Sequence, residues 1–133
     1  HLGAKNLIKV LDNIDIITPQ KQSEIGACYA NKITKEEAEL NWNENAENLM
    51  RKIRVFNPWP GTFFYHNNEK IKVLSAKYDA SSHEFKPGTI IDNKSLVIAC
   101  AQGSFQPLTL QRSGKNPTAT VDFLRGYKIE SFN

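Results

Sequence analysis

The sequence has few of the residues from which common catalytic and metal-binding sites are built. Its 133 residues include two cysteines, three histidines and one methionine. It has no nucleotide-binding loop of the form GxxxxGKS/T or GxGxxG, no HExxH metal motif and no GxSxG nucleophile motif. None of the histidines has a partner at the spacing of a metal site. The sequence therefore predicts neither a catalytic residue nor a metal site.

Long apolar runs are also missing, since none approaches the roughly 18 residues of a membrane-spanning segment. We therefore expect no contact with a membrane. The start of the sequence has no initiator methionine and no signal-peptide pattern, so we expect it to be the middle of a longer chain. The two cysteines, Cys28 and Cys100, lie outside any CxxC pattern. This usage is typical of buried thiols in a reducing compartment, and it predicts a cytoplasmic protein.

Composition and charge predict a folded protein with a weakly basic second half. Hydrophobic residues make up 40% of the chain and charged residues 23%. These values argue against disorder and suit one domain, or one small domain with an appendage. Residues 1–60 carry eight basic and eight acidic side chains, whereas residues 61–133 carry nine basic and six acidic ones. The second half could therefore attract a polyanion, though weakly.

The first half of the chain predicts helices separated by a polar linker. A helix is predicted over residues 3–14 by an apolar stripe at helical spacing, formed by Leu7, Ile8, Leu11 and Ile14. Thr34 and Glu37 fit a capping box, which predicts a short helical turn ending near Leu40. The strongest helix is predicted over residues 44–55, capped by Asn43 and stopped at Asn57-Pro58.

The second half changes to the alternation that is typical of strands. Five short strands are predicted, over residues 62–66, 70–78, 88–91, 96–101 and 105–110. Asn67-Asn68-Glu69 is a hairpin signal, and Pro107 indicates an edge position or a bulge in the last strand. A short helix over about 119–125 is predicted to end at Gly126, a C′ glycine. This spacing favours a small closed or nearly closed barrel with flanking helices.

A stiff segment with two large aromatics joins the strongest helix to the first strand. It consists of Phe56, Asn57, Pro58, Trp59, Pro60 and Gly61. Alternating prolines favour an extended backbone with few internal hydrogen bonds. The structural interpretation is that Phe56 and Trp59 plug the end of the barrel and fix the helix onto it. The functional alternative is that Trp59 stacks on a nucleobase or another ligand.

Basic side chains near the end of the chain have two interpretations. The set consists of Lys94, Arg112, Lys115, Arg125 and Lys128. Composition alone favours a solvated surface. The functional alternative is phosphate binding, for which the loop Arg112-Ser113-Gly114-Lys115-Asn116 is the best local candidate. It offers two cations and free backbone amides on a flexible turn.

Several motifs, in order along the chain, resemble the C-terminal region of methionyl-tRNA formyltransferases. The matching segments are YANKITKEE at 29–37, IRVFNPWPG at 53–61, PGTI at 87–90, LQRSGK at 110–115 and DFLRG at 122–126. The family patterns for the first two are YAxKIxKEEA and IRAFNPWPG. FNPWPG is a specific signal, and the ordered set is stronger still.

The resemblance implies a transferase of two domains. Its N-terminal Rossmann-like domain moves a formyl group from 10-formyltetrahydrofolate to the methionine of initiator tRNA. The catalytic motifs of that domain are absent here, so the resemblance assigns no catalytic residue and no cofactor to this sequence. Residues 1–17 correspond to the last helix of that domain, residues 18–43 to the linker and residues 44–133 to the C-terminal domain. The fold implied is a small open β-barrel of oligonucleotide-binding type, preceded by a helical linker.

The resemblance also implies partners and binding residues. We expect a monomer that contacts the N-terminal catalytic domain through the FNPWPG junction and holds initiator tRNA through its phosphates, with little sequence readout. The first candidates for tRNA contacts are Arg112 and Lys115. Further candidates are Lys94, Arg125 and Lys128, and also Arg51 and Arg54, which flank the junction.

Three positions depart from the family pattern. Asn116 replaces the second lysine of LQxxGKK, which removes one phosphate contact. Ala119 replaces a serine that usually caps the last helix, so Thr118 or Thr120 is expected to cap it instead. Asn41 stands before Trp42, where the family usually has an aspartate.

Two other functions remain open from the sequence. The domain could be a scaffold that touches no RNA, as part of a related formyltransferase acting on sugars or folate. A stand-alone barrel that binds single strands is a weaker alternative, because the strands present few exposed aromatics in a row.

Overall fold

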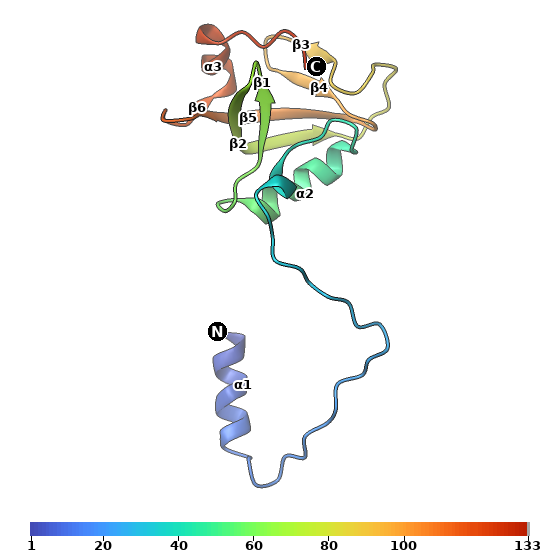
Figure 1. Ribbon diagram of the computed structural model, residues 1–133, viewed down its shortest axis with the longest axis vertical. Helices are drawn as coiled ribbons and strands as arrows, with labels where there is room; N and C mark the ends of the chain where they lie inside the picture. Colours follow the sequence, from blue (N-terminus) through green and yellow to red (C-terminus); the bar gives the residue numbers. More distant parts are fainter. Residues whose placement is uncertain (133) are drawn as a thin grey trace. The chain divides into compact units, whose positions relative to one another are not determined.

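The computed structural model describes residues 1–132 and divides into two compact units, with the boundary between Lys32 and Ile33. The first unit contains one helix, α1 (Leu2–Leu11), followed by turns and an extended segment (Figure 1). The predicted helix is therefore confirmed, although it ends three residues early. None of its residues is buried, and the apolar residues Leu7, Ile8 and Leu11 are 57–60% exposed. The helix thus forms although its apolar face is exposed.

The second unit is built on one antiparallel sheet of six strands in the order β1-β2-β5-β4-β3, with β6 paired to β5. The strands are β1 (Phe63–His66), β2 (Glu69–Asp79), β3 (Ile90–Asp92), β4 (Val97–Ala99), β5 (Ser104–Arg112) and β6 (Thr118–Ala119). The predicted class, mainly β with flanking helices, is confirmed. The sheet is not a closed barrel, because β1 and β3 end the strand order without pairing to each other.

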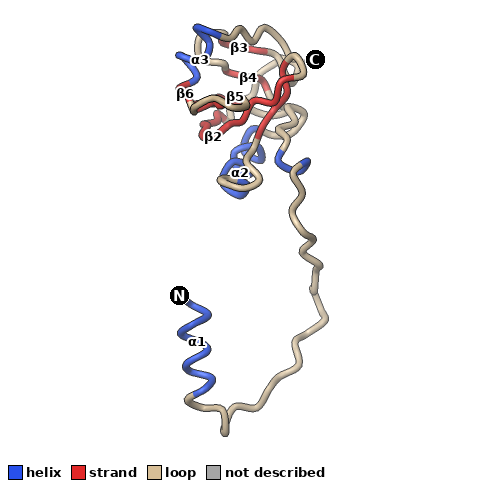
Figure 2. The backbone as a smooth tube through the Cα atoms, turned by 60° about the vertical axis from the view of Figure 1, so that its left-hand side comes forward, coloured by secondary structure: helices blue, strands red, loops and turns tan. Residues whose placement is uncertain are grey.

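Helix α2 (Ala46–Phe56) lies against this sheet (Figure 2). Leu49 and Ile53 join the main core with Phe64 and Ile71. Complete burial of a leucine side chain contributes about 1.5–3 kcal/mol. The N-cap is Asn45, so the prediction of Asn43 was wrong. The helix thus begins two residues later than predicted. At this start, Ala46 donates its N–H to the carbonyl of Gln102, which is distant in the sequence.

The β1–β2 hairpin follows the sequence signal closely. Asn67 and Asn68 have positive φ angles of 49° and 61°, the conformation that tight hairpin turns need and that asparagine tolerates. Pro107 lies in β5, a central strand, so the edge alternative was wrong. The bulge alternative holds, because Pro107 pairs with Ala76 beside a register shift between β2 and β5.

Aromatic side chains lie between the two edges of the sheet. The ring centroid of Trp42 lies 5.8 Å from that of Phe64 in β1 and 5.0 Å from that of Phe132 near the chain end. Phe132 also lies beside Gly88, just before β3. The carbonyl of Trp42 accepts the N–H of Ala101, and Asn41 Oδ1 accepts the N–H of Asn43 at 3.0 Å. Asn41 thus supplies a turn acceptor without a charge.

The short helices differ in detail from their predictions. Only half of the capping box forms, since Thr34 donates its N–H to Glu37 Oε1 at 2.8 Å. The helical part of the linker is one 3₁₀ turn, Glu36–Ala38. Helix α3 (Thr120–Gly126) includes Gly126 itself, which has no positive φ, so the C′ prediction was wrong. Neither threonine caps α3 as predicted, because Thr118 Oγ1 donates to Asn116 O and Thr120 Oγ1 to Pro107 O.

The two cysteines lie in contrasting surroundings. Cys100 is fully buried, and this burial raises the pKa of its thiol to about 12. Cys28 is exposed, so the expectation of a buried thiol fails for it. No helix in the described part of the chain is both long and apolar enough to cross a membrane.

Candidate nucleic-acid interface

Strand β2 turns a row of lysines away from the core. Ile71 and Val73 are buried, so their neighbours Lys70 and Lys72 lie on the opposite face of the pleated strand. Lys72 pairs with Gln111 of β5 and Lys77 pairs with Gln106. The cross-strand neighbours of both lysines are therefore neutral, and this outer face gathers positive charge.

A small pocket of about 140 Å³ lies at one end of this face. Its walls come from β2, the end of β5 and the loop after it, through Lys70, Lys72, Gln111, Arg112, Ser113 and Gly114. We call it the basic pocket. The predicted loop residues Arg112 and Gly114 thus meet two lysines that sequence reasoning missed. A signal was present, since β2 carries no acidic residue between Glu69 and Asp79.

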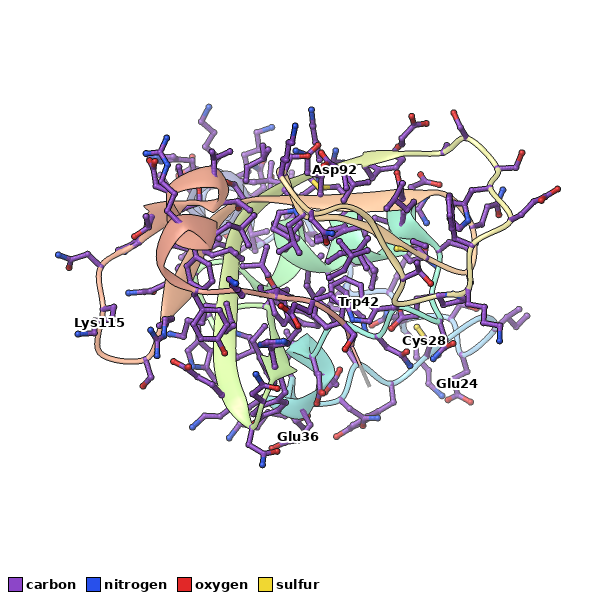
Figure 3. The ribbon with its side chains drawn as sticks, turned by 90° about the horizontal axis from the view of Figure 1, so that it is seen from above. Glu24, Cys28, Glu36, Trp42, Asp92 and Lys115 are labelled. Carbon is purple, nitrogen blue, oxygen red and sulfur yellow. The ribbon has the colours of Figure 1, made fainter. Side chains whose placement is uncertain are left out.

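The loop beside the basic pocket is a tight turn. Lys115 donates its N–H to Arg112 O at 3.1 Å, and Gly114 has a φ of 69°, which favours glycine. Gln111 Nε2 donates to Lys115 O at 2.8 Å and fixes the turn from inside. Among residues 1–132, no protein acceptor takes the N–H of Ser113 or Gly114. Lys115 extends from this loop at the outside of the domain (Figure 3).

Arg112 is held by groups of its own chain. Its guanidinium makes two contacts with Glu69, Nε–Oε1 at 2.7 Å and NH2–Oε2 at 3.0 Å. These bonds lower the pKa of Glu69 and raise that of Arg112. The guanidinium also lies 4.8 Å from the ring centroid of Tyr127, whose hydroxyl is 3.1 Å from His66 Nδ1. The ion pair of Arg112 with Glu69 links the β1–β2 hairpin to β5, and the contact of Arg112 with Tyr127 links both to the segment after α3.

Lys70 is positioned by an aromatic ring. Its Nζ lies 3.4 Å from the ring centroid of Phe63, a cation–π contact that leaves the ammonium able to bind an anion. Hydrogen bonds to its own backbone and to Thr34 lower the pKa of Glu36, and the charge of Lys70 adds a smaller effect. The carboxylate of Glu36 thus acts on Lys70 through its charge, and no ion pair joins the two among residues 1–132.

The other predicted binding residues are not gathered at the basic pocket. Arg51 lies 2.7 Å from Glu47, and Arg125 lies 2.7 Å from Asp122, so each has a carboxylate partner on its own helix. Lys128 lines a separate groove with Asn93, the neighbour of Lys94. Arg54, Lys94 and Lys128 are exposed. Their predicted contacts with RNA stay predictions.

The FNPWPG segment has one aromatic inside and one outside. Phe56 is buried with Ala38 and Phe63, as the structural interpretation expected. Trp59 is 58% exposed, so its predicted role as a plug was wrong. Asn57 Nδ2 donates to Leu74 O at 2.9 Å and fastens the segment to β2. The alternative of ligand stacking by Trp59, and the domain-junction role, stay predictions.

No acid–base or metal constellation emerges from the described residues. No group of three or more histidine, cysteine, aspartate or glutamate residues within 1–132 could hold a metal ion. His66 Nδ1 lies 3.1 Å from the Tyr127 hydroxyl, and His83 Nε2 lies 2.7 Å from Gly103 O. The arrangement of the second unit is suited to binding anions.

Comparison with known sequences gives a family and close relatives. A family model described as the C-terminal domain of formyl transferase matches residues 32–128. The chain is 47% identical to the methionyl-tRNA formyltransferase of Rickettsia bellii (strain RML369-C), over 100% of this chain and 43% of that protein. It is 49% identical to that of Rickettsia prowazekii (strain Madrid E), over 97% and 42%. The chain thus spans less than half the length of these curated relatives.

Solved structures show the same fold at much lower identity. A multiply substituted variant of HypX from Aquifex aeolicus has a TM-score of 0.59 at 18% identity, over 93% of this chain and 23% of that chain. HypX in complex with tetrahydrofolic acid has a TM-score of 0.55 at 16% identity, over 89% and 22%. These likenesses concern the fold alone.

Proposed function

We propose, given that the chain belongs to the family of formyl transferase C-terminal domains, that it holds initiator tRNA for a methionyl-tRNA formyltransferase. The relatives named methionyl-tRNA formyltransferase support the enzyme class. The observation that carries the tRNA role is the outer face of β2 and β5. Its lysines have no ion-pair partner within residues 1–132, and the basic pocket adds backbone donors.

The mechanism is electrostatic positioning. Lysine side chains neutralise phosphates and release condensed counterions, which gives salt-sensitive binding without readout of bases. Holding the tRNA body brings its aminoacyl end to the catalytic domain and makes formyl transfer effectively intramolecular. In this proposal, that other domain takes the formyl group from 10-formyltetrahydrofolate. The chain described here contributes binding and orientation, with no step of bond making.

The residues of the proposed interface fall into two groups. Lys70, Lys72 and Lys115 carry most of the binding, because their ammonium groups are not paired with carboxylates among residues 1–132. Arg112 contributes less than the sequence suggested, because Glu69 already takes two of its donors. The exposed residues Arg54, Lys94 and Lys128 extend the surface only if the RNA reaches them.

The experiment measures binding of initiator tRNA to the chain by fluorescence anisotropy over a salt series. The variant Lys72→Ala/Lys115→Ala is compared with the charge-matched control Lys9→Ala/Lys86→Ala, which changes exposed lysines elsewhere. We expect weaker binding and a salt slope shallower by about 1.4–1.8 in the first variant, since each contact contributes about 0.7–0.9. We expect no such change in the control.

Absence of binding at about 50 mM salt, with the chain folded by circular dichroism, would overturn this function. The scaffold of a sugar- or folate-type formyltransferase would then take its place. Equal weakening in both variants would show attraction by net charge only, and would remove the interface on β2.

A further inference from the structure

The basic pocket is much smaller than four other cavities of the surface. It measures about 140 Å³, whereas the others span about 370–650 Å³. About 10–15 Å³ of such space is enough for one water molecule, so a phosphate group, with its five heavy atoms, has room in the basic pocket.

The charge around the basic pocket favours a doubly charged anion. The cations at the pocket and its loop are Lys70, Lys72, Arg112 and Lys115. The nearby carboxylates are Glu69, which is paired with Arg112, and Glu36, which acts on Lys70 from a distance. Four positive and two negative charges leave +2. An internal phosphodiester carries −1, whereas a phosphate monoester carries about −1.5 to −2 at pH 7.

Neutral donors complete the lining. The N–H groups of Ser113 and Gly114 have no protein acceptor among residues 1–132, and Gly114 has no side chain that could block an approaching oxygen. The Ser113 hydroxyl likewise makes no hydrogen bond within that range. Successive backbone N–H groups on a turn are a recurrent way of binding phosphate oxygens. The lysines of β2 line one side of the pocket and the turn lines the other, so an anion could accept hydrogen bonds from both sides.

The geometry points to a terminal phosphate as the ligand. A phosphodiester inside a chain has ester bonds leaving on two sides, and it suits an open groove. A monoester has one such bond and can enter a small pocket by its three free oxygens. We propose that the basic pocket binds the 5′-phosphate at the end of an RNA chain. This inference rests on the proposed function and adds to it a fixed point on the RNA.

The test compares tRNA with a 5′-phosphate against the same tRNA with a 5′-hydroxyl. Binding to the full chain is measured by anisotropy at 0.1 M salt with a label on the 3′ end. Two further proteins are measured in parallel: Lys72→Ala, which removes a wall of the pocket, and Lys77→Ala. The second is a matched control, because Lys77 is a lysine of the same strand that lines a different cavity.

We expect the 5′-phosphate to strengthen binding by the wild-type chain about tenfold. The advantage falls below twofold in Lys72→Ala and stays near tenfold in Lys77→Ala. If wild type binds both RNAs equally while Lys72→Ala weakens both, the pocket takes an internal phosphate. The tRNA-holding function then stands and this inference falls. If neither RNA binds, the proposed function itself falls, and this inference falls with it.

Inorganic phosphate distinguishes an RNA end from a free small anion. It is added up to 10 mM to 5′-phosphorylated tRNA, with sodium chloride adjusted to constant ionic strength. We expect less than a twofold loss of binding, because a free anion lacks the contacts of the RNA body. Complete loss of the 5′-phosphate advantage would assign the pocket to free phosphate and overturn the assignment to RNA.

Discussion

Helices and sheet in the second unit hold their cations in different ways. On α2 and α3, Arg51 and Arg125 each contact a carboxylate three or four residues away, at 2.7 Å. On β2, Lys72 and Lys77 face Gln111 and Gln106 across the sheet. A helix brings charges at i+3 and i+4 together, whereas a strand puts neighbours on opposite faces. A count of basic residues therefore overestimates the unpaired positive charge on the helices relative to that on the sheet.

The largest effect is expected from removing the two sheet lysines of the basic pocket. Lys70→Ala/Lys72→Ala should weaken tRNA binding by roughly 25- to 60-fold at 0.1 M salt, as expected for two lost phosphate contacts. The matched helix variant, Arg51→Ala/Arg125→Ala, removes the same charge and should weaken binding less than threefold. Anisotropy titrations measure both. Similar losses in the two variants would erase the contrast between helix and sheet.

An intermediate effect is expected from removing the carboxylate that is paired with Arg112. Glu69→Gln removes the carboxylate that holds Arg112, so tRNA affinity at 0.1 M salt should rise about fivefold, the value of one added contact. Glu47→Gln frees Arg51 on α2 in the same way and serves as control, with an expected change below twofold. An unchanged affinity in Glu69→Gln would mean that Arg112 faces away from the RNA.

A smaller effect is expected on acid stability. The folded-state pKa of Glu69 is lowered, chiefly by its hydrogen bonds with Arg112. Its contribution to stability is therefore present above the ordinary glutamate pKa of about 4.3 and is lost as pH falls through the folded value. The midpoint of thermal unfolding, followed between pH 7 and pH 3, should fall less in Arg112→Ala than in wild type. Parallel pH profiles would show that the pair adds no stability.

The smallest effect is expected from the exposed helix pair alone. Arg51→Ala should change the free energy of unfolding by only about 0.3–0.5 kcal/mol, because solvent screens an exposed i,i+4 pair. Urea denaturation at two salt concentrations measures this, and the difference should vanish at 1 M salt. A loss above 1 kcal/mol that persists in salt would show that Arg51 also packs through its alkyl chain.

Local patterns predicted most elements of the second unit. The Asn67-Asn68 turn, the helix before Asn57-Pro58 and the strand alternation at Ile71 and Val73 depend on nearby residues, and they were confirmed. The errors involve distant partners. The start of α2 is set by a hydrogen bond from Ala46 to Gln102. Pro107 is tolerated in a central strand because the register between β2 and β5 shifts beside it, where β5 carries the extra residue Leu108.

The sequence predicted only one of the two segments that form the candidate site. The loop from Arg112 to Lys115 is conspicuous by its composition, and its residues Arg112, Ser113 and Gly114 line one side of the basic pocket. Lys70 and Lys72 lie in the strand predicted over residues 70–78, but the sequence does not show that this strand meets the loop, because pairing between β2 and β5 crosses about forty residues of sequence. The ion pair of Arg112 with Glu69 has the same separation. Contacts of this kind become visible only once the register of the sheet is known.

The contrast between the two tryptophans gives the protein two optical reporters. Trp42 is 9% exposed among phenylalanines between the sheet edges, whereas Trp59 is 58% exposed on its stiff loop. A buried indole emits at shorter wavelength than a hydrated one. In a Trp59→Phe protein, the emission maximum would follow the opening of the sheet edges. In a Trp42→Phe protein, quenching would show whether a partner covers the loop.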